Sequence, residues 1–444
     1  MRWTGMIGPR RSKAKPGRIM ERLRIEKVVH GGFGLARREG RVWLIPWTAP
    51  ADLVEARPVR EHRTWVEAEC VSVLEPGPDR VSPRCPWYRK CGGCHMQHLA
   101  PEAQVRARTD ILIESLRRVA GLSGLAPQVV AGNPWEYRSR VEFHVAASDI
   151  GFFARGTHDL VPIEDCWIAV PEIRRLIPEL RRAIAEAQVF GPASIEAVVG
   201  IDRAVVLVCD GPPGWFTPRL PGLLMALPGV VGVWLHARAR HWLSFGRASL
   251  RFGTSPGGPC VDLDPRGFSQ ANIGLNPQLV EIAARWVGAN HSSILELYAG
   301  AGNFTLPLLR RDPNASLTAV ESNRDALNAL ERAGRDLAPG RLTCIAADAE
   351  VGVRRLLEQR RRFDCILADP PRAGIGKTAR LIPRFGATRI VLVSCEPMTL
   401  ARDAGVLREA GYRVGSLALV DMFPQTAHVE AVLRMEADPD PSRS

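Results

Sequence analysis

Hydrophobic and polar positions divide the chain into segments with different patterns. From about residue 277 to residue 436, short apolar runs alternate with stretches of helical patterning. This alternation is typical of a doubly wound α/β sheet with helices on its faces. The apolar runs predict strands at Ile294–Tyr298, Leu317–Val320, Leu342–Ala346, Cys365–Ala368, Ile390–Val393, Arg413–Val420 and Val429–Met435.

The segment from about Arg18 to Val81 has a different pattern, in which short strands are separated by glycine turns. Such a pattern in a segment of this length predicts a small β-barrel. The run Gly32-Phe-Gly-Leu-Ala-Arg37, followed by Val42-Trp-Leu-Ile-Pro46, resembles a TRAM domain, which is a small RNA-binding barrel. The predicted strands are Arg22–Val29, Val42–Pro46 and Val66–Leu74, with Gly31, Gly32 and Gly34 forming a tight connection after the first.

Between these two regions the pattern is mixed. A cysteine-rich loop at Ser82–His98 precedes a basic helix at Glu102–Val119, whose apolar residues recur on one side. The following segment, Gln128–Asp264, combines strands and a helix. Its predicted elements are a hairpin at Val141–Ala147 and Gly151–Ala154, a helix at Pro171–Ala187, and a strand pair at Ile195–Gly200 and Val205–Cys209.

Charge and composition narrow the class of protein. The chain carries 59 Lys and Arg against 47 Asp and Glu, a net charge of +12, which favours a polyanionic partner without identifying one. Residues 1–17 are basic and lack the apolar stretch of a secretory signal, so we expect a disordered arm in a cytoplasmic protein. No apolar run approaches the roughly 18 residues that span a bilayer. The 10 cysteines are therefore expected as thiols or metal ligands.

The α/β segment contains a candidate site for an adenosyl ligand. Gly300 and Gly302 follow the first strand, where they allow a sharp turn and a close approach of the backbone to a ligand. A glycine pair alone also fits a dinucleotide site or a plain turn. Glu321 and Asp348 end the next two strands, where carboxylates suit ribose hydroxyls and an adenine ring. These acidic ends, without the full Gly-x-Gly-x-x-Gly run, favour a ligand with no phosphate.

Two further strand ends carry reactive groups. Strand four ends in Asp369-Pro-Pro-Arg372 and strand five in Ser394-Cys395-Glu396-Pro397. Ligands bind at the carboxyl edge of such sheets. A cysteine just before a helix is expected to have its thiolate stabilised by the helix dipole. A lone cysteine is more often a buried packing residue, so the assignment depends on the motifs around it.

Those motifs resemble the RNA uracil-5-methyltransferase family over nearly the whole chain. They are Gly267-Phe-Ser-Gln-Ala-Asn272, Asp369-Pro-Pro-Arg-Ala-Gly374, Val393-Ser-Cys-Glu-Pro-Met-Thr-Leu-Ala-Arg-Asp403 and Met422-Phe-Pro-Gln-Thr-Ala-His-Val-Glu430. The resemblance implies that Cys395 is the nucleophile and Glu430 the base. It also implies S-adenosylmethionine as cofactor, held by Gln270, Tyr298, Asn303, Glu321, Asp348 and Asp369. Asp369 and Arg372 are candidates for holding either the flipped base or the cofactor. His428 is expected to have a structural or orienting role.

The chemistry of uracil agrees with these roles. C5 is a poor nucleophile until a thiolate adds to C6 and moves electron density toward C5. After methyl transfer the C5 proton must leave, which requires a positioned base such as a carboxylate. Both faces of the ring must be reached, so the nucleotide has to leave any stack.

The cysteine pattern Cys85-x5-Cys91-x2-Cys94, with Cys166 downstream, is a candidate four-thiolate metal site. Spacing alone fits either zinc, which it slightly favours, or an iron–sulfur cluster. The family resemblance implies a [4Fe–4S] cluster with a structural role. The remaining cysteines are expected to be packing residues: Cys70, Cys209, Cys260, Cys344 and Cys365.

We therefore predict a multidomain α/β protein: a TRAM-like β-barrel at 18–81, a mixed α+β central domain with an iron–sulfur loop at 82–276, and a class I Rossmann-like methyltransferase domain at 277–444. The leading hypothesis is a monomeric enzyme that makes 5-methyluridine in 23S rRNA and binds no membrane. Alternatives are methylation of tRNA, amino-methylation of adenine or guanine, and an RNA-binding iron–sulfur protein without catalysis.

Overall fold

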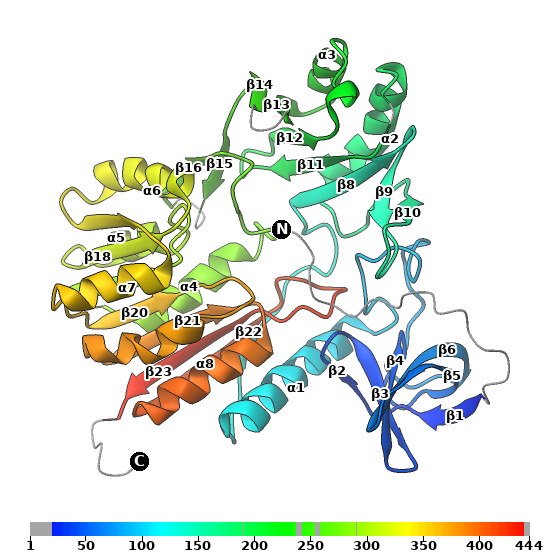
Figure 1. The fold of residues 1–444 in the computed structure, drawn as a ribbon, viewed down its shortest axis with the longest axis horizontal. Coiled ribbons are helices and arrows are strands. Elements are labelled where there is room, and N and C mark those ends of the chain that lie inside the picture. Colours follow the sequence, from blue (N-terminus) through cyan, green and yellow to red (C-terminus); the bar gives the residue numbers. More distant parts are fainter. Residues whose placement is uncertain (1–19, 190, 237–241, 254–257, 290, 439–444) are drawn as a thin grey trace.

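A computed structural model describes residues 20–189, 191–236, 242–253, 258–289 and 291–438. The predicted basic arm at 1–17 lies outside these residues. The described residues form three large sheets and one two-stranded sheet. Each large sheet forms a lobe in Figure 1, with one long helix beneath the C-terminal lobe. No helix in the described ranges is long and apolar enough to cross a membrane.

The N-terminal sheet (blue in Figure 1) curls around its own core. Its order is β1-β5-β6-β4-β3-β2. The strand predicted at Arg22–Val29 is split, because the backbone N–H groups of Ile25 and Glu26 donate to other segments. The strands are β1 (Glu21–Arg24), β2 (Lys27–Val29), β3 (Phe33–Arg38), β4 (Arg41–Pro46), β5 (Leu53–Glu61) and β6 (Trp65–Glu75).

The central sheet has the order β10-β9-β8-β11-β12-β13-β14, and helix α2 (Pro171–Glu186) packs its apolar face against it. Its strands are β8 (Arg140–Ala146), β9 (Asp149–Phe153), β10 (Leu160–Pro162), β11 (Ala193–Val199), β12 (Val205–Asp210), β13 (Val230–His236) and β14 (Trp242–Gly246). Smaller elements are η1 (Pro213–Trp215), α3 (Leu220–Met225), β15 (Leu250–Gly253) and β16 (Cys260–Leu263).

The C-terminal sheet has the order β19-β18-β17-β20-β21-β23-β22-β7 and carries apolar cores on both faces. Strands β17 to β21 run parallel, and β23 is antiparallel to β21 and β22. The strands are β7 (Gln128–Val130), β17 (Ser293–Leu297), β18 (Ser316–Glu321), β19 (Leu342–Ala346), β20 (Cys365–Ala368), β21 (Arg389–Ser394), β22 (Tyr412–Val420) and β23 (Ala431–Ala437). The helices are α4 (Asn276–Val287), α5 (Thr305–Arg311), α6 (Arg324–Leu337), α7 (Ala349–Glu358), η2 (Gly376–Arg380), η3 (Ile382–Phe385) and α8 (Pro397–Glu409).

Helix α1 (Pro101–Ala120) connects the cysteine-rich loop to the C-terminal lobe. Pro101 suits its first turn, and Gly121 ends it in the left-handed conformation, donating its N–H to the carbonyl of Leu116. Leu112 and Leu116 are fully buried, and α1 packs against α8. Figure 1 shows the two helices side by side. The predicted mixed α/β fold is confirmed, while the domain boundaries stay predictions.

This packing predicts that truncating the Leu116 side chain lowers the stability of the protein. Leu116→Ala should lower the free energy of unfolding by about 2–5 kcal/mol, because it removes buried methylene groups and leaves a cavity. Val119, on the same helix, is 42% exposed, so Val119→Ala should change stability by less than about 1 kcal/mol. Thermal unfolding followed by circular dichroism measures both variants. Equal shifts of the two midpoints would contradict the packing of α1.

Candidate active site

The register of the C-terminal sheet brings the two predicted catalytic residues together. Strands β21 and β23 pair antiparallel, with Ser394 opposite Ala431. Cys395 follows Ser394 and Glu430 precedes Ala431. Because the strands run antiparallel, Cys395 and Glu430 are next to this pair on the same side of it. Asp369 follows β20, which lies on the other side of β21. Both carboxyl groups raise the pKa of the Cys395 thiol, which agrees with their closeness.

The surroundings of Cys395 disfavour its thiolate. Burial is the largest cause and raises the pKa of the thiol to about 12, and Glu430 adds to it while Arg372 opposes it. The expectation that the helix dipole lowers this pKa is therefore wrong. The reason is burial of the thiol, which is the largest cause; a lesser cause is Glu396, the N-cap of α8, whose carboxylate accepts from the backbone N–H of Met398 at 3.4 Å. That negative charge, directly after Cys395 in the chain, also raises the pKa of the thiol.

Glu430 and Asp369 form a pair of buried carboxyl groups. Glu430 is 4% exposed, and burial first and Asp369 second raise its pKa well above the usual value, while Arg372 lowers it. Burial likewise raises the pKa of Asp369 to about 7. Two like charges in a low-dielectric site resist joint ionisation. The pair can therefore hold and release a proton near neutral pH.

His428 lies at the rim of the same site. The guanidinium of Arg372 approaches its ring nitrogens at 3.3 and 3.5 Å, and the ring of His95 meets it edge-on at 6.1 Å. Burial, with Arg372 and His95 next, lowers the pKa of His428 well below the usual value. The ring is therefore neutral at physiological pH. Its predicted orienting role stays a prediction.

The predicted cofactor residues follow the parallel strands β17, β18 and β19. Both oxygens of Glu321 accept backbone N–H groups, from Gly300 at 2.9 Å and from Asn323 at 2.7 Å. Asp348 is the N-cap of α7, and its charge helps to raise the pKa of Tyr298 to about 12, after burial as the largest cause. These strand ends therefore lie along one edge of the sheet.

Asn303 and Gln270 occupy different settings. Asn303 exchanges two side-chain hydrogen bonds with Asn276 at the start of α4, at 2.8 and 3.1 Å. Gln270 lies in the segment before α4, where the carbonyl of the next residue, Ala271, accepts from the N–H and hydroxyl of Ser139. No described contact joins Gln270 to the other candidate residues.

The structure adds a buried carboxyl group that was not among the predicted site residues. Glu296 is 1% exposed in β17, and Thr305 donates to it at 2.6 Å. Burial, with Asp369 and Glu321 contributing, raises its pKa to about 8. The only signal in the sequence is a glutamate within the apolar strand Ser293–Leu297.

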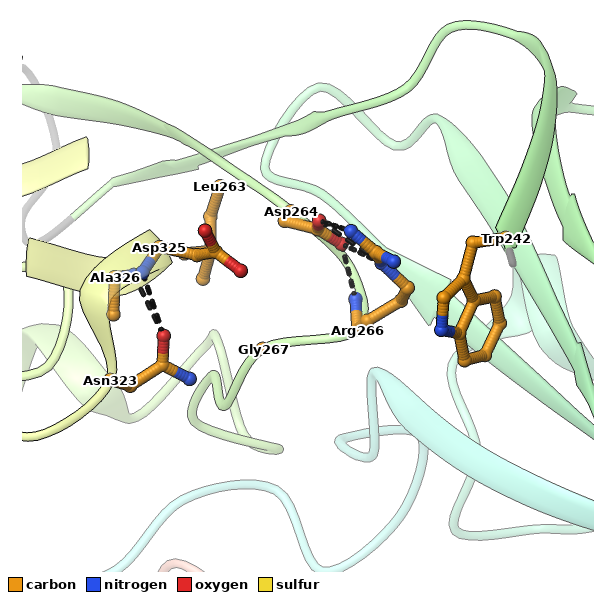
Figure 2. A pocket seen from close by; sticks show the side chains of 8 residues that line it. All are labelled: Trp242, Leu263, Asp264, Arg266, Gly267, Asn323, Asp325 and Ala326. Atoms are coloured by element: carbon orange, nitrogen blue, oxygen red, sulfur yellow. Dashed lines mark hydrogen bonds and ion pairs between the residues drawn. The ribbon is translucent and has the colours of Figure 1, made fainter. Parts of the chain in front are cut away.

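A hollow of about 210 Å³ lies beside the N-terminus of α6 (Figure 2). Asn323 and Asp325 line one side, and the ion pair of Arg266 with Asp264 lines the other. The guanidinium of Arg266 also stands 5.1 Å from the ring of Trp242. Cys395 and Glu430 are not in its lining, so this hollow is separate from their site.

The cysteines predicted to bind a cluster influence one another. Burial and, to a lesser extent, Cys85 raise the pKa of the Cys91 thiol to about 11. Burial and, to a lesser extent, Cys91 raise the pKa of the Cys166 thiol to about 12. Burial and the other three thiols also raise the pKa of Cys94. Yet within the described residues no group of three or more His, Cys, Asp and Glu side chains is arranged to hold a metal ion. The ligand set therefore stays a prediction.

The remaining cysteines only partly follow expectation. Cys70, Cys209 and Cys365 are buried, whereas Cys344 is half-buried. Cys260 is exposed at the start of β16, so its assignment as a packing residue is wrong. The reason is that β15 and β16 form a separate two-stranded hairpin, with Cys260 on its exposed side.

Comparison with known proteins identifies the family. A model described as tRNA (Uracil-5-)-methyltransferase matches residues 345–437, and one described as Conserved hypothetical protein 95 matches residues 281–390. The 23S rRNA (uracil(1939)-C(5))-methyltransferase RlmD of Pseudomonas putida is 32% identical, over 97% of this chain and 96% of that protein. This chain belongs to the RlmD family. The RlmD protein of Hahella chejuensis is 31% identical, over 93% of this chain and 96% of that protein.

A solved structure supports the fold. The tRNA (uracil-54, C5)-methyltransferase of Pyrococcus abyssi, in complex with S-adenosyl-L-homocysteine, matches with a TM-score of 0.73 and 22% identity. The match covers 94% of this chain and 100% of that one. The predicted resemblance to RNA uracil-5-methyltransferases is thus confirmed at the level of the family.

The site predicts an unusual pH profile for alkylation of Cys395. Only the thiolate reacts, so iodoacetamide should label Cys395 slowly at about pH 8, and roughly tenfold faster for each further pH unit below its raised pKa. Glu430→Gln removes a negative charge that raises this pKa. The variant should therefore shift the labelling profile toward lower pH, with Asp369, Glu396 and Arg372 still facing the thiol.

Peptide mass spectrometry after timed labelling measures each cysteine separately. The exposed Cys260 is the internal control, and its labelling should be the same in both proteins. Identical profiles for Cys395 in the two proteins would contradict the coupling to Glu430.

Proposed function

We propose that this protein transfers a methyl group from S-adenosylmethionine to C5 of a uridine in 23S rRNA. The observation that carries the proposal is the strand register that places Cys395 beside Glu430. The family to which the chain belongs supplies the reaction class, and the substrates named for its relatives support 23S rRNA. Methylation of tRNA is the second candidate, supported by the family model that matches residues 345–437.

In the proposed mechanism, Cys395 releases its proton to solvent water and its sulfur bonds to C6 of the uracil, which converts the ring to an enolate. C5 then attacks the sulfonium methyl group, and the thioether S-adenosylhomocysteine leaves. Glu430 next removes the proton from C5, and the returning electron pair expels the Cys395 thiolate. Its raised pKa makes Glu430 a stronger base than an ordinary carboxylate.

We further propose that S-adenosylmethionine binds along the ends of β17 to β20. The proposed contacts are the side chains of Gln270, Tyr298, Asn303, Glu321, Asp348 and Asp369. Glu321 supports this best, because two backbone N–H groups fix its carboxylate while further lone pairs are left for ribose hydroxyls. The cofactor supplies the electrophilic methyl group, and these residues orient it toward the ring held by Cys395.

The four cysteines of the cysteine-rich region are proposed to hold a [4Fe–4S] cluster. Their donor chemistry fits, because thiols of this set raise the pKa values of three of its members, and they become compatible once a metal replaces their protons. The ligands would be Cys85, Cys91, Cys94 and Cys166. The role proposed for the cluster is structural, because methyl transfer needs no electron transfer. A TRAM-like barrel and a Rossmann-like methyltransferase domain complete the proposed architecture.

RNA that contains 5-fluorouridine tests the mechanism. The fluorine cannot leave as a proton does, so the methylated ring should stay bonded to Cys395 and appear as a protein–RNA adduct on denaturing gels. Cys395→Ala should form no adduct, whereas Glu430→Gln should form it but lose turnover on ordinary RNA. Separate assays with 23S rRNA and tRNA decide the substrate. An active enzyme without any adduct would contradict the covalent route and favour amino-methylation.

Metal analysis tests the cysteine site. Protein purified without oxygen should contain about four iron and four sulfide per chain and absorb near 400 nm. Cys91→Ser should lose most of both, and Cys260→Ser is the matched control because its thiol is exposed and outside the pattern. Zinc without sulfide in the unaltered protein would overturn the iron–sulfur assignment and favour a zinc site.

A further inference from the structure

The segment between β22 and β23, residues 421–430, ends in the proposed base Glu430, and we call it the base loop. It forms no strand or helix, yet Asp421, Gln425 and Thr426 are at most 5% exposed. Gln425 also has a left-handed backbone with φ of +66°. Buried polar groups of an irregular loop need partners elsewhere.

Helix α1 supplies partners from more than 300 residues away in sequence. The Gln104 side chain donates to the Gln425 side-chain oxygen at 2.9 Å and accepts from the Gln425 backbone N–H at 2.8 Å. One turn later, Arg108 donates to the carbonyl of Thr426 at 2.8 Å and to the carboxylate of Asp421 at 2.8 Å. Gln104 and Arg108 are each 1% exposed.

Other segments hold the same loop. The backbone N–H groups of His95 and Met96, in the cysteine-rich loop, donate to the carbonyl of Gln425 at 2.9 and 3.0 Å. The Tyr137 hydroxyl donates to the carbonyl of Pro424 at 2.8 Å. These contacts limit the conformations of the loop. Among the described residues, Gln104 and Arg108 are the pair on one helix that binds both side chains and backbone of the loop.

We propose that Gln104 and Arg108 are positioning residues that hold Glu430 at the distance needed to remove the C5 proton. The inference rests on the proposed function. Neither residue is placed in contact with the reacting atoms, and both act through the base loop. Proton removal needs the base within about 3 Å of its target, and a displacement of about 1 Å costs roughly a hundredfold in rate. Substitution of Gln104 or Arg108 should therefore slow the step in which Glu430 removes the C5 proton.

The order of the proposed steps gives a test that distinguishes a displaced Glu430 from general misfolding of the variant. Adduct formation on 5-fluorouridine RNA needs Cys395 and the cofactor but no removal of a proton from C5. Turnover on uridine RNA needs all steps. A displaced Glu430 should reduce turnover without slowing adduct formation, and methylated RNA should accumulate on the enzyme.

Gln104→Leu removes both side-chain hydrogen bonds to Gln425. We expect its kcat on uridine RNA to fall by about tenfold to a hundredfold, with an adduct rate on 5-fluorouridine RNA within about twofold of the unaltered protein. The double variant Arg108→Met with Asp421→Asn removes a buried ion pair without leaving one charge alone, and should behave alike. Arg106→Leu is the control, because Arg106 is exposed on the same helix.

The outcomes separate the two levels of the proposal. Absence of an adduct with the unaltered protein would overturn the covalent function itself. A second outcome is that the unaltered protein forms the adduct while Gln104→Leu and the double variant lose adduct rate and turnover equally. That result would overturn the positioning role and indicate general damage to the protein. Unchanged turnover in both would overturn it as well.

Discussion

The antiparallel register between β21 and β23 is the constraint on which the proposed active site depends. It sets Ser394 opposite Ala431, and so places Cys395 and Glu430 side by side although 34 residues separate them in the chain. A shift of one residue would turn every side chain of β23 to the other face of the sheet. Apolar cores on both faces make such a shift costly, because Val432 and Leu433 are both fully buried, on opposite faces. The packing of the sheet therefore fixes the geometry of the site.

Burial at this sheet edge has opposite consequences for nucleophile and base. It raises the pKa of Glu430, which strengthens it as a base, and it raises the pKa of Cys395, which leaves the thiol protonated. Arg372 acts on both groups, because its charge lowers both pKa values. In the proposed mechanism, the Cys395 thiol must therefore lose its proton before its sulfur can bond to C6 of the uracil.

The sequence indicated the parts of the fold that depend on local pattern. The apolar runs of β17 to β21 located the strands, and the motifs around Cys395 located the site. The pairing of β7 with β22 could not be predicted, because three residues of a distant segment carry no register information. Strand β5 was missed because Pro58 interrupts its pattern and its pairing with β6 shifts register three times. The raised pKa of Cys395 depends first on burial of its thiol and then on Glu430, neither of which the position of the cysteine before a helix revealed.

The base loop depends on parts of the chain that lie outside the predicted methyltransferase domain. Its buried polar groups find their partners outside residues 277–444, in α1, in the cysteine-rich loop and at Val130 of β7, whose carbonyl accepts from the N–H of Asp421. Each unpartnered buried group costs about 1–3 kcal/mol. The left-handed backbone at Gln425 adds about 1–2 kcal/mol that only surrounding contacts can offset. An isolated C-terminal domain would carry all of these costs at the loop that ends in Glu430. Segments that precede residue 277 in the chain thus complete the hydrogen bonding of the base loop.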